Sequence, residues 1–348
     1  MEELARREAL GVLRIEMHER VGSRQQGAEQ PARPGLPLIS HRARMPPAPG
    51  FGKENKGVGP RNGGPAWRDL PNRRRRARMG GMVLFDTHAH FDAFEAEGSV
   101  AAVLARAAAA GVARMCAVGS SEASNELVVR LAQEHPEALV AAVGYDRDQL
   151  DRPRGAEKLA ELATRPGVVA VGEIGLDYYY SAETASAQRA LFGQMLEFAA
   201  ERKLPVVVHS RYADDDTVDL LGEFSTVWKK VFHSMENLPP LGILHCFTGD
   251  AAFAEELLAL GFFISFSGIV SFNNAGPLRE VAKLVPEDRL LIETDCPYLT
   301  PKPFRGKVNE PAFVARVAEV LAEARGTAAE ALAASTTANA KRVFQLEA

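Results

Sequence analysis

The sequence predicts an α/β protein of the (β/α)8 TIM-type barrel class, and three observations support that prediction. From residue 82 to the end, short apolar, β-branched segments alternate with long Ala-, Leu- and Glu-rich segments of helical period. Eight strand signals occur in residues 82–348, and a single barrel typically takes about 250 residues. A competing open doubly wound sheet would carry a glycine-rich phosphate loop after its first strand, whereas this strand runs into the string DTHAH.

Each predicted strand is a short apolar run of four to six residues, and each predicted helix is a longer run with helical spacing of its apolar residues. The predicted strands are Val83–Asp86, Arg114–Val118, Leu139–Val143, Val168–Glu173, Pro205–His209, Gly242–His245, Phe262–Phe266 and Leu290–Glu293. The predicted helices are Ser99–Ala110, Ser121–His135, Ala156–Thr164, Ala185–Lys203, Ala213–Leu221, Ala251–Leu260, Pro277–Val285, Pro311–Ala324 and Ala328–Val343.

The composition is that of a protein with a large core and no membrane span. Hydrophobic residues make up 46% of the 348, yet no run of about 18 apolar residues occurs. The charged N-terminus lacks the apolar core of a signal peptide. The three cysteines, Cys116, Cys246 and Cys296, form no short-spaced pair, which argues against a disulfide framework or a zinc knuckle. We therefore expect a cytoplasmic location, and we expect a monomer without an obligatory protein partner.

Residues 1–81 are predicted to be a separate, disordered extension, because Pro and Gly interrupt them heavily and few apolar residues recur at a regular period. A dispensable extension is the favoured interpretation. A short charged helix over Met1–Glu19, a basic arm that contacts nucleic acid, and a true start at Met79 or Met82 are the alternatives.

Charge is divided unevenly between the two parts of the chain. Residues 1–81 hold 17 of the 41 Lys and Arg and 8 of the 45 Asp and Glu, which gives +9 there and −13 for residues 82–348. An acidic domain does not bind nucleic acid through a basic surface. If its substrate is a polyanion, bound metal cations are the expected source of compensating charge.

A His, Glu or Asp stands where five of the predicted strands end. In a barrel these ends meet at one mouth, where active sites lie. His88 and His90 are two residues apart on one strand, so their side chains share a face. Any one of these residues alone would be explained as a structural histidine, a cap or an ion-pair partner, but their joint placement favours a site. The predicted metal ligands are His88, His90, Glu173, His209, His245 and Asp295.

Imidazoles and carboxylates together suit divalent ions such as Zn, Mn or Mg, whereas Ca alone is disfavoured. Six ligands exceed one tetrahedral site, so we expect two ions with Glu173 as the bridging carboxylate. Such ions would activate a water for hydrolysis, with Asp295 as general base. Arg211 is a candidate for phosphate contact or for an ion pair at the rim. Tyr298 is a candidate for stacking on a base, although packing beneath Asp295 is favoured.

Several strings together resemble the TatD family of metal-dependent hydrolases, within the amidohydrolase-like group. They are HAHFD, GEIGLDYYY, VVHSR, LHCFTGD, GFFISFSGIVSF and ETDCPYLTP, in that order, and the resemblance covers about residues 83–348. It implies a divalent-metal-dependent nuclease, a 3′–5′ exonuclease on single-stranded DNA with possible action on RNA. The family's metal ligands correspond to the same six residues. The resemblance also implies D-aminoacyl-tRNA deacylation as an alternative.

Two further matters are left open by the sequence. The stretch Gly222–Pro240 is longer than a short connection, and it carries Trp228 and Phe232 next to two lysines. A helix extension with its own apolar face is favoured over an aromatic and basic loop that stacks on nucleotides. Rival functions are hydrolysis of a carboxylic ester or amide, and non-catalytic binding of nucleic acid through the basic arm.

Overall fold

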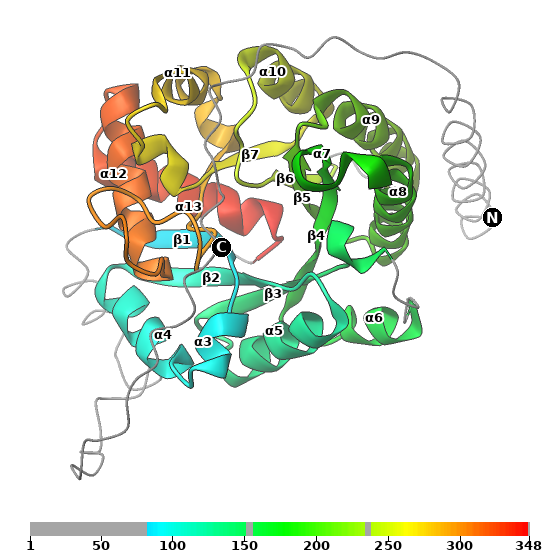
Figure 1. Ribbon diagram of the computed structural model, residues 1–348, viewed down its shortest axis with the longest axis horizontal. Helices are drawn as coiled ribbons and strands as arrows, with labels where there is room; N and C mark the ends of the chain where they lie inside the picture. Colours follow the sequence, from blue (N-terminus) through cyan, green and yellow to red (C-terminus); the bar gives the residue numbers. More distant parts are fainter. Residues whose placement is uncertain (1–81, 151–155, 234–237, 347–348) are drawn as a thin grey trace.

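A computed structural model describes residues 82–150, 156–233 and 238–346 (Figure 1). The predicted extension 1–81, with its proposed helix and basic arm, lies outside the described residues. The chain forms eight strands that pair in parallel in sequence order. A parallel bridge between Ala89 and Cys296 joins the first and last strand regions and closes the sheet. The predicted (β/α)8 barrel is therefore confirmed.

The strands agree closely with the predicted ones, and β1, β4 and β5 continue two to four residues further towards the site. They are β1 Leu84–Ala89, β2 Val112–Val118, β3 Leu139–Val143, β4 Val168–Asp177, β5 Val206–Arg211, β6 Gly242–Leu244, β7 Phe263–Phe266 and β8 Leu290–Ile292.

The helices surround the barrel as a ring (Figure 1). The longer ones are α4 Val100–Ala109, α5 Glu122–Glu134, α6 Ala156–Leu162, α8 Ala185–Arg202, α9 Asp214–Val231, α10 Ala251–Leu260, α11 Gly276–Leu284, α12 Val314–Arg325 and α13 Ala329–Val343. Short helical segments that the sequence did not predict include α3 Asp92–Ala96, α7 Tyr178–Ser181 and the 3-10 turns η3 Arg147–Gln149 and η5 Gly268–Ser271. No helix of the described chain combines the length and the apolar character needed to cross a membrane.

Two buried clusters follow from the two-residue alternation of side chains along each strand. One cluster takes residues from all eight strands and fills the barrel, and α13 supplies Phe344 and its neighbours to it. The ring of Phe344 contacts Phe85 with centroids 5.7 Å apart, and Thr337 donates a hydrogen bond to the Val83 carbonyl, so α13 covers the amino-terminal end of the barrel. The other cluster lies between the strands and the surrounding helices. The carboxyl-terminal mouth is left for polar residues.

Helix α9 is ten residues longer at its C-terminal end than predicted, because its apolar face continues. Trp228 is fully buried, and its ring packs between those of Phe224 and Phe232 at centroid distances of 5.3 and 4.7 Å. Its indole N–H donates to the Pro239 carbonyl. The favoured helix extension is confirmed, and the alternative that Trp228 stacks on nucleotides is wrong.

We expect Trp228→Ala to lower the free energy of unfolding by about 3–5 kcal/mol, because the change leaves a large cavity in a packed core and an unpaired carbonyl. Urea denaturation measures this. The exposed Leu284→Ala on α11 is the control and should stay within about 0.5 kcal/mol of the wild type. A Trp228→Ala midpoint equal to that of the control would contradict the packing described here.

Candidate metal centre

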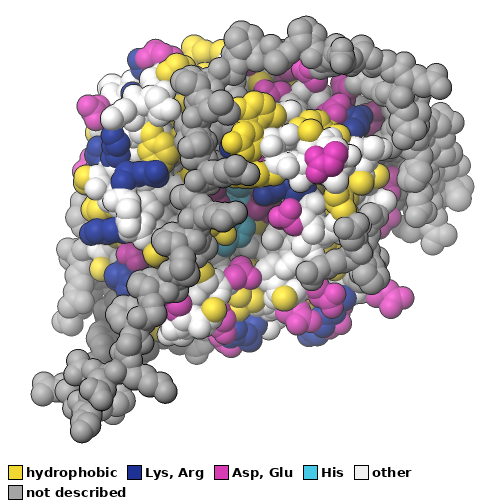
Figure 2. All heavy atoms as spheres, in the orientation of Figure 1, with side chains coloured by type: hydrophobic (Ala, Val, Ile, Leu, Met, Phe, Trp, Pro, Cys, Tyr) yellow, Lys and Arg dark blue, Asp and Glu magenta, His cyan; other side chains and the backbone are white. Residues whose placement is uncertain are grey.

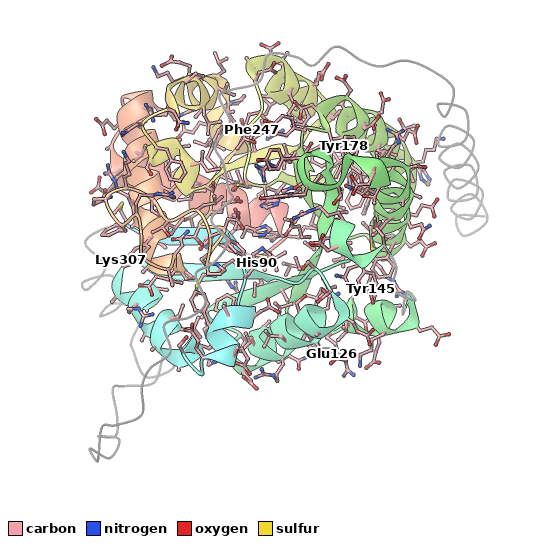
Figure 3. All side chains as sticks on the ribbon, viewed as in Figure 1. His90, Glu126, Tyr145, Tyr178, Phe247 and Lys307 are labelled. Atoms are coloured by element: carbon pink, nitrogen blue, oxygen red, sulfur yellow. The ribbon has the colours of Figure 1, made fainter. Side chains whose placement is uncertain are left out.

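Strand ends bring the six predicted ligands to one place at the barrel mouth. His88 lies in β1 and His90 directly follows it, Glu173 lies in β4, and His209 lies in β5. His245 and Asp295 follow β6 and β8, and Figure 3 shows His90 near the middle of the ring of helices. Asp295 has a left-handed backbone, with φ of 54°, and its N–H donates to the His88 carbonyl. This hydrogen bond holds Asp295 against the β1 ligands.

Glu173 offers one carboxylate oxygen to each of two histidine pairs. Its Oε2 lies 3.6 Å from His88 Nε2 and 3.5 Å from His90 Nε2. Its Oε1 lies 3.5 Å from both His209 Nδ1 and His245 Nε2. Glu173 therefore places one carboxylate oxygen against each set of imidazole nitrogens.

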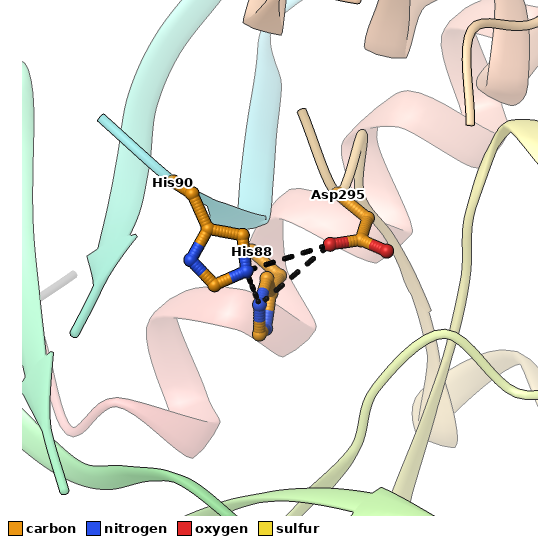
Figure 4. A group of neighbouring side chains, drawn as sticks. All are labelled: His88, His90 and Asp295. Atoms are coloured by element: carbon orange, nitrogen blue, oxygen red, sulfur yellow. Dashed lines mark hydrogen bonds and ion pairs between the residues drawn. The ribbon is translucent and has the colours of Figure 1, made fainter. Parts of the chain in front are cut away.

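Asp295 completes the first of these sets. Its Oδ1 lies 3.9 Å from His88 Nε2 and 3.6 Å from His90 Nε2, and the two nitrogens are 3.1 Å apart (Figure 4). The ligand atoms of His88, His90 and Asp295 all lie within 4.8 Å of one another, and so do those of His88, Glu173 and His245.

The donor set fits divalent cations better than it fits hydrogen bonding alone. Two pairs of imidazole nitrogens face each other, at 3.1 Å in one pair and at 3.2 Å between His209 and His245. The rings of His88 and His245 also stack with centroids 3.8 Å apart. The Nδ1 atom of His88 is buried without a hydrogen-bond partner among the described residues. Nitrogens that converge in this way share a cation more readily than protons.

Burial and mutual proximity shift the ionisation of the cluster. Burial, followed by the neighbouring His245, lowers the pKa of His88 to about 4. Burial would lower the pKa of His245 too, but hydrogen bonding and charge from Glu173 and Glu293 outweigh it and raise that pKa to about 10. The same imidazoles hold the pKa of Glu173 well below its usual value in spite of burial. Burial raises the pKa of Asp295 to about 7.

Carboxylates that the sequence analysis missed orient the histidines from behind. Glu293 Oε1 lies 3.4 Å from His245 Nδ1 and accepts the Cys246 N–H at 2.6 Å. Asp177 Oδ2 lies 3.3 Å from His209 Nε2. Such partners fix the orientation of ligand imidazoles. Both carboxylates stand in the same strand-end strings as the predicted ligands, and this position is the signal that would have found them.

Arg147 and Asp86 were also missed. Arg147, in η3 after β3, places guanidinium nitrogens 3.6 Å from both Glu173 Oε1 and Asp177 Oδ2. Asp86, in β1, accepts hydrogen bonds from the N–H and the hydroxyl of Thr294 at 2.9 and 2.5 Å. Burial raises the pKa of Asp86 to about 8. No motif in the sequence signals Arg147, because its partners lie on another strand.

The two predicted substrate-binding residues lie at the rim of the centre. The Arg211 guanidinium sits 3.9 Å above the centre of the Tyr179 ring, and no ion pair joins it to a carboxylate of the described chain. Tyr298 is 57% exposed, and its ring meets that of His90 edge-on with centroids 6.3 Å apart. Tyr298 therefore does not pack beneath Asp295, contrary to the favoured expectation.

A buried cluster of imidazoles and carboxylates at the mouth of a (β/α)8 barrel defines the class of metal-dependent hydrolases. A family model described as TatD related DNase matches residues 85–345. The chain belongs to this TatD family.

Individual relatives agree with the assignment. The chain is 43% identical over 270 residues to the uncharacterized metal-dependent hydrolase YcfH of Escherichia coli (strain K12), covering 77% of this chain and 97% of YcfH. It is 36% identical to a protein of Citrobacter rodentium named 3′-5′ ssDNA/RNA exonuclease TatD, over 70% of this chain and 90% of the relative. The crystal structure of the TatD homologue YJJV from Escherichia coli K12 matches with a TM-score of 0.68 and 31% identity, over 76% of this chain and 98% of that one.

We expect the affinity for Mn²⁺ or Zn²⁺ to rise with pH through the neutral range, by up to about tenfold per pH unit. His245, with its pKa raised to about 10, carries a proton at neutral pH that a cation must displace. Calorimetric titrations between pH 6 and 8, in buffers with different ionisation enthalpies, measure both the affinity and the protons released. The exposed His233→Ala is the control and should behave as the wild type. An affinity independent of pH, with no proton release, would contradict this assignment.

Proposed function

We propose that this protein is a divalent-metal-dependent 3′–5′ exonuclease that hydrolyses phosphodiester bonds of single-stranded DNA, with RNA as a second substrate. The observation that carries the proposal is Glu173, whose two oxygens each face a separate pair of imidazoles 3.5–3.6 Å away. That arrangement suits two cations, and two-cation sites are common in enzymes that cleave phosphate esters. The relative from Citrobacter rodentium named as a single-stranded DNA and RNA exonuclease supports the substrate class.

The remaining chemistry is distributed over residues of this chain. Two cations held by the six ligands would neutralise the phosphate and bring the pKa of the attacking water towards neutrality. Asp295 is the general base, because its carboxylate lies 3.6–3.9 Å from the ligand nitrogens of His90 and His88, beside the place where the attacking water would be held. Glu173 keeps the two histidine pairs at a fixed separation, and Glu293 and Asp177 keep the His245 and His209 rings in orientation.

Glu173 is the residue whose removal tests the proposed centre most directly. With Mn²⁺ or Mg²⁺, the wild type should release mononucleotides from single-stranded DNA, and Glu173→Ala should lose at least about a hundredfold in rate, because both cations lose their shared ligand. The measurement uses 5′-end-labelled oligonucleotides, which distinguish digestion from the 3′ end from other polarities. Glu256→Ala, which removes an exposed carboxylate on α10, is the matched control and should keep full activity.

Two other outcomes have definite meanings. Equal activity in Glu173→Ala and wild type would point to a contaminating nuclease or a different site. No digestion by a folded, metal-loaded wild type would overturn the nuclease proposal. In that case hydrolysis of a carboxylic ester by the same centre would be measured, with D-aminoacyl-tRNA as the substrate.

The guanidinium of Arg147 lies beside Glu173 and Asp177, and its side chain is 20% exposed. We expect it to contact a non-bridging oxygen of the substrate phosphate. Arg147→Ala should lower kcat/KM by about 10–100-fold, because a hydrogen bond to a charged group contributes about 1.5–3 kcal/mol. Arg147→Lys, which keeps the positive charge, should retain part of the activity. Arg165→Ala, at an exposed pair with Glu161, is the control. Unchanged kcat/KM, with metal content equal to that of the wild type, would remove Arg147 from the mechanism.

A further inference from the structure

The most exposed aromatic residues of the described chain lie beside the candidate metal centre. The chain has six tyrosines. Three of them, Tyr180, Tyr212 and Tyr298, are 52–57% exposed, and they are the most exposed aromatic side chains among the described residues. Tyr180 and Tyr212 follow β4 and β5, whose ends carry Asp177 and His209. Tyr298 follows Asp295. Figure 2 shows histidine atoms within this face, with basic and hydrophobic side chains close to them.

On the β4–β5 side the rings form an ordered group around Arg211. The rings of Tyr179 and Tyr212 stack with centroids 5.4 Å apart and an interplanar angle of 27°. The guanidinium of Arg211 lies 3.9 Å from the Tyr179 ring centre and 5.0 Å from that of Tyr180. We call Tyr179, Tyr180, Arg211 and Tyr212 the tyrosine–arginine group. It combines flat, exposed rings with a cation that no carboxylate of the described chain neutralises.

This group is fixed to the metal centre by shared residues. Asp177 Oδ1 accepts the N–H groups of Tyr179 and Tyr180, while its Oδ2 contacts His209 Nε2. Arg211 is two residues after His209 on β5, so the two side chains point to the same side of the strand. One carboxylate therefore positions both a ligand histidine and the aromatic group.

Two more contacts hold the group in place. The hydroxyl of Tyr178 donates to Asp216 at 2.6 Å, and Arg189 pairs with the same carboxylate, which ties α7 to α8 and α9. Figure 3 shows Tyr178 on the α7 side of the mouth. Tyr212 has a left-handed backbone with φ of 56°, a sparsely populated conformation for a bulky residue. The protein thus maintains an unfavourable backbone that leaves the Tyr212 ring in solvent.

Tyr298 provides a second aromatic position on the β8 side, edge-on to His90. The centre therefore has an exposed ring on each of two sides. Exposed tyrosine rings are suited to unpaired bases, which present flat faces for stacking. The Arg211 guanidinium among the rings is suited to the backbone phosphate that joins two such bases. A base in a duplex is already stacked and paired, so the same rings discriminate against double strands.

We infer that the tyrosine–arginine group and Tyr298 are two nucleotide-binding subsites, one on each side of the scissile phosphodiester, that recognise unpaired bases by stacking. The inference rests on the proposed function for its substrate. The tyrosine–arginine group takes one base on Tyr212 and the adjoining phosphate on Arg211. Tyr298 takes the base of the other nucleotide.

The test compares an all-thymidine oligonucleotide with one of equal length whose two 3′-terminal positions lack bases. Both carry the same phosphates, so only stacking differs. For the metal-loaded wild type we expect kcat/KM to be at least about tenfold lower on the abasic oligonucleotide, mainly through KM. Equal values would overturn the inference without any variant.

Variants locate the effect. Tyr212→Ala and Tyr298→Ala should each raise KM on the normal oligonucleotide about tenfold and reduce the preference for bases, while Tyr212→Phe and Tyr298→Phe, which keep the ring, should behave as the wild type. Leu284→Ala removes an exposed apolar side chain on α11 and serves as the control. Alanine variants that keep the full preference for bases, with unchanged metal content and thermal midpoint, would overturn the inference.

A binding measurement separates failure of this inference from failure of the proposed function. Fluorescence anisotropy with a phosphorothioate oligonucleotide reports affinity without requiring cleavage. If binding depends on the rings but the protein cleaves no phosphodiester bond, the subsite inference holds and the nuclease proposal is overturned. If the rate of cleavage depends neither on the tyrosine rings nor on the bases of the oligonucleotide, the nuclease proposal holds and the subsite inference is overturned.

Discussion

The candidate metal centre depends on the position of Glu173 between four imidazoles, of which those of His88 and His245 are buried. Despite burial, the imidazoles hold the pKa of Glu173 low, and Glu173 and Glu293 hold that of His245 high, so the cluster contains a buried carboxylate paired with a protonated imidazole. Imidazole nitrogens that face each other at 3.1 and 3.2 Å beside buried carboxylates are costly unless a cation satisfies them. The barrel accommodates this cost because apolar residues fill its interior and α13 covers its amino-terminal end, while a second apolar cluster packs between the strands and the helices. Chemistry and stability thus occupy opposite ends of one set of strands.

Closing the barrel and building the metal centre use the same contacts. The seam between β1 and β8 is formed by the Ala89–Cys296 bridge, by Asp295 N–H donating to the His88 carbonyl, and by Asp86 accepting two hydrogen bonds from Thr294. Three predicted ligands, His88, His90 and Asp295, lie along this seam. A shift of the seam by one residue would turn each strand's side chains to the opposite face and remove the ligands from the mouth. The ligand positions are therefore a consequence of the strand register.

The fold and the six-residue cluster could be predicted from sequence because both follow from periodicity: apolar runs give the strands, and the barrel rule brings their ends together. What could not be predicted depends on contacts between elements. The role of Arg147 follows from the short distances between its guanidinium and the carboxylates of Glu173 and Asp177, which cannot be derived from the spacing of these residues in the sequence. The exposure of Tyr298 depends on the backbone turn after β8. How far the favoured extension of the helix predicted over Ala213–Leu221 would run could not be read from the sequence, because its length depends on the burial of Phe224 and Trp228 against other elements.

The distribution of charge explains how an acidic domain can accommodate a polyanion. Residues 82–348 carry a formal charge of −13, so long-range attraction does not guide nucleic acid to this domain. At the mouth, positive charge comes from Arg147, which carboxylates flank, and from Arg211, which aromatic rings flank, and the ligand cluster there is suited to divalent cations. Salt screens the charge of Arg147 little because its side chain is only 20% exposed. Under the proposed function, recognition of a nucleic-acid substrate then depends on short-range contacts with the exposed tyrosine rings and with the groups that bind the phosphate. An enzyme built in this way should respond to ionic strength less than a protein that binds nucleic acid through a basic surface.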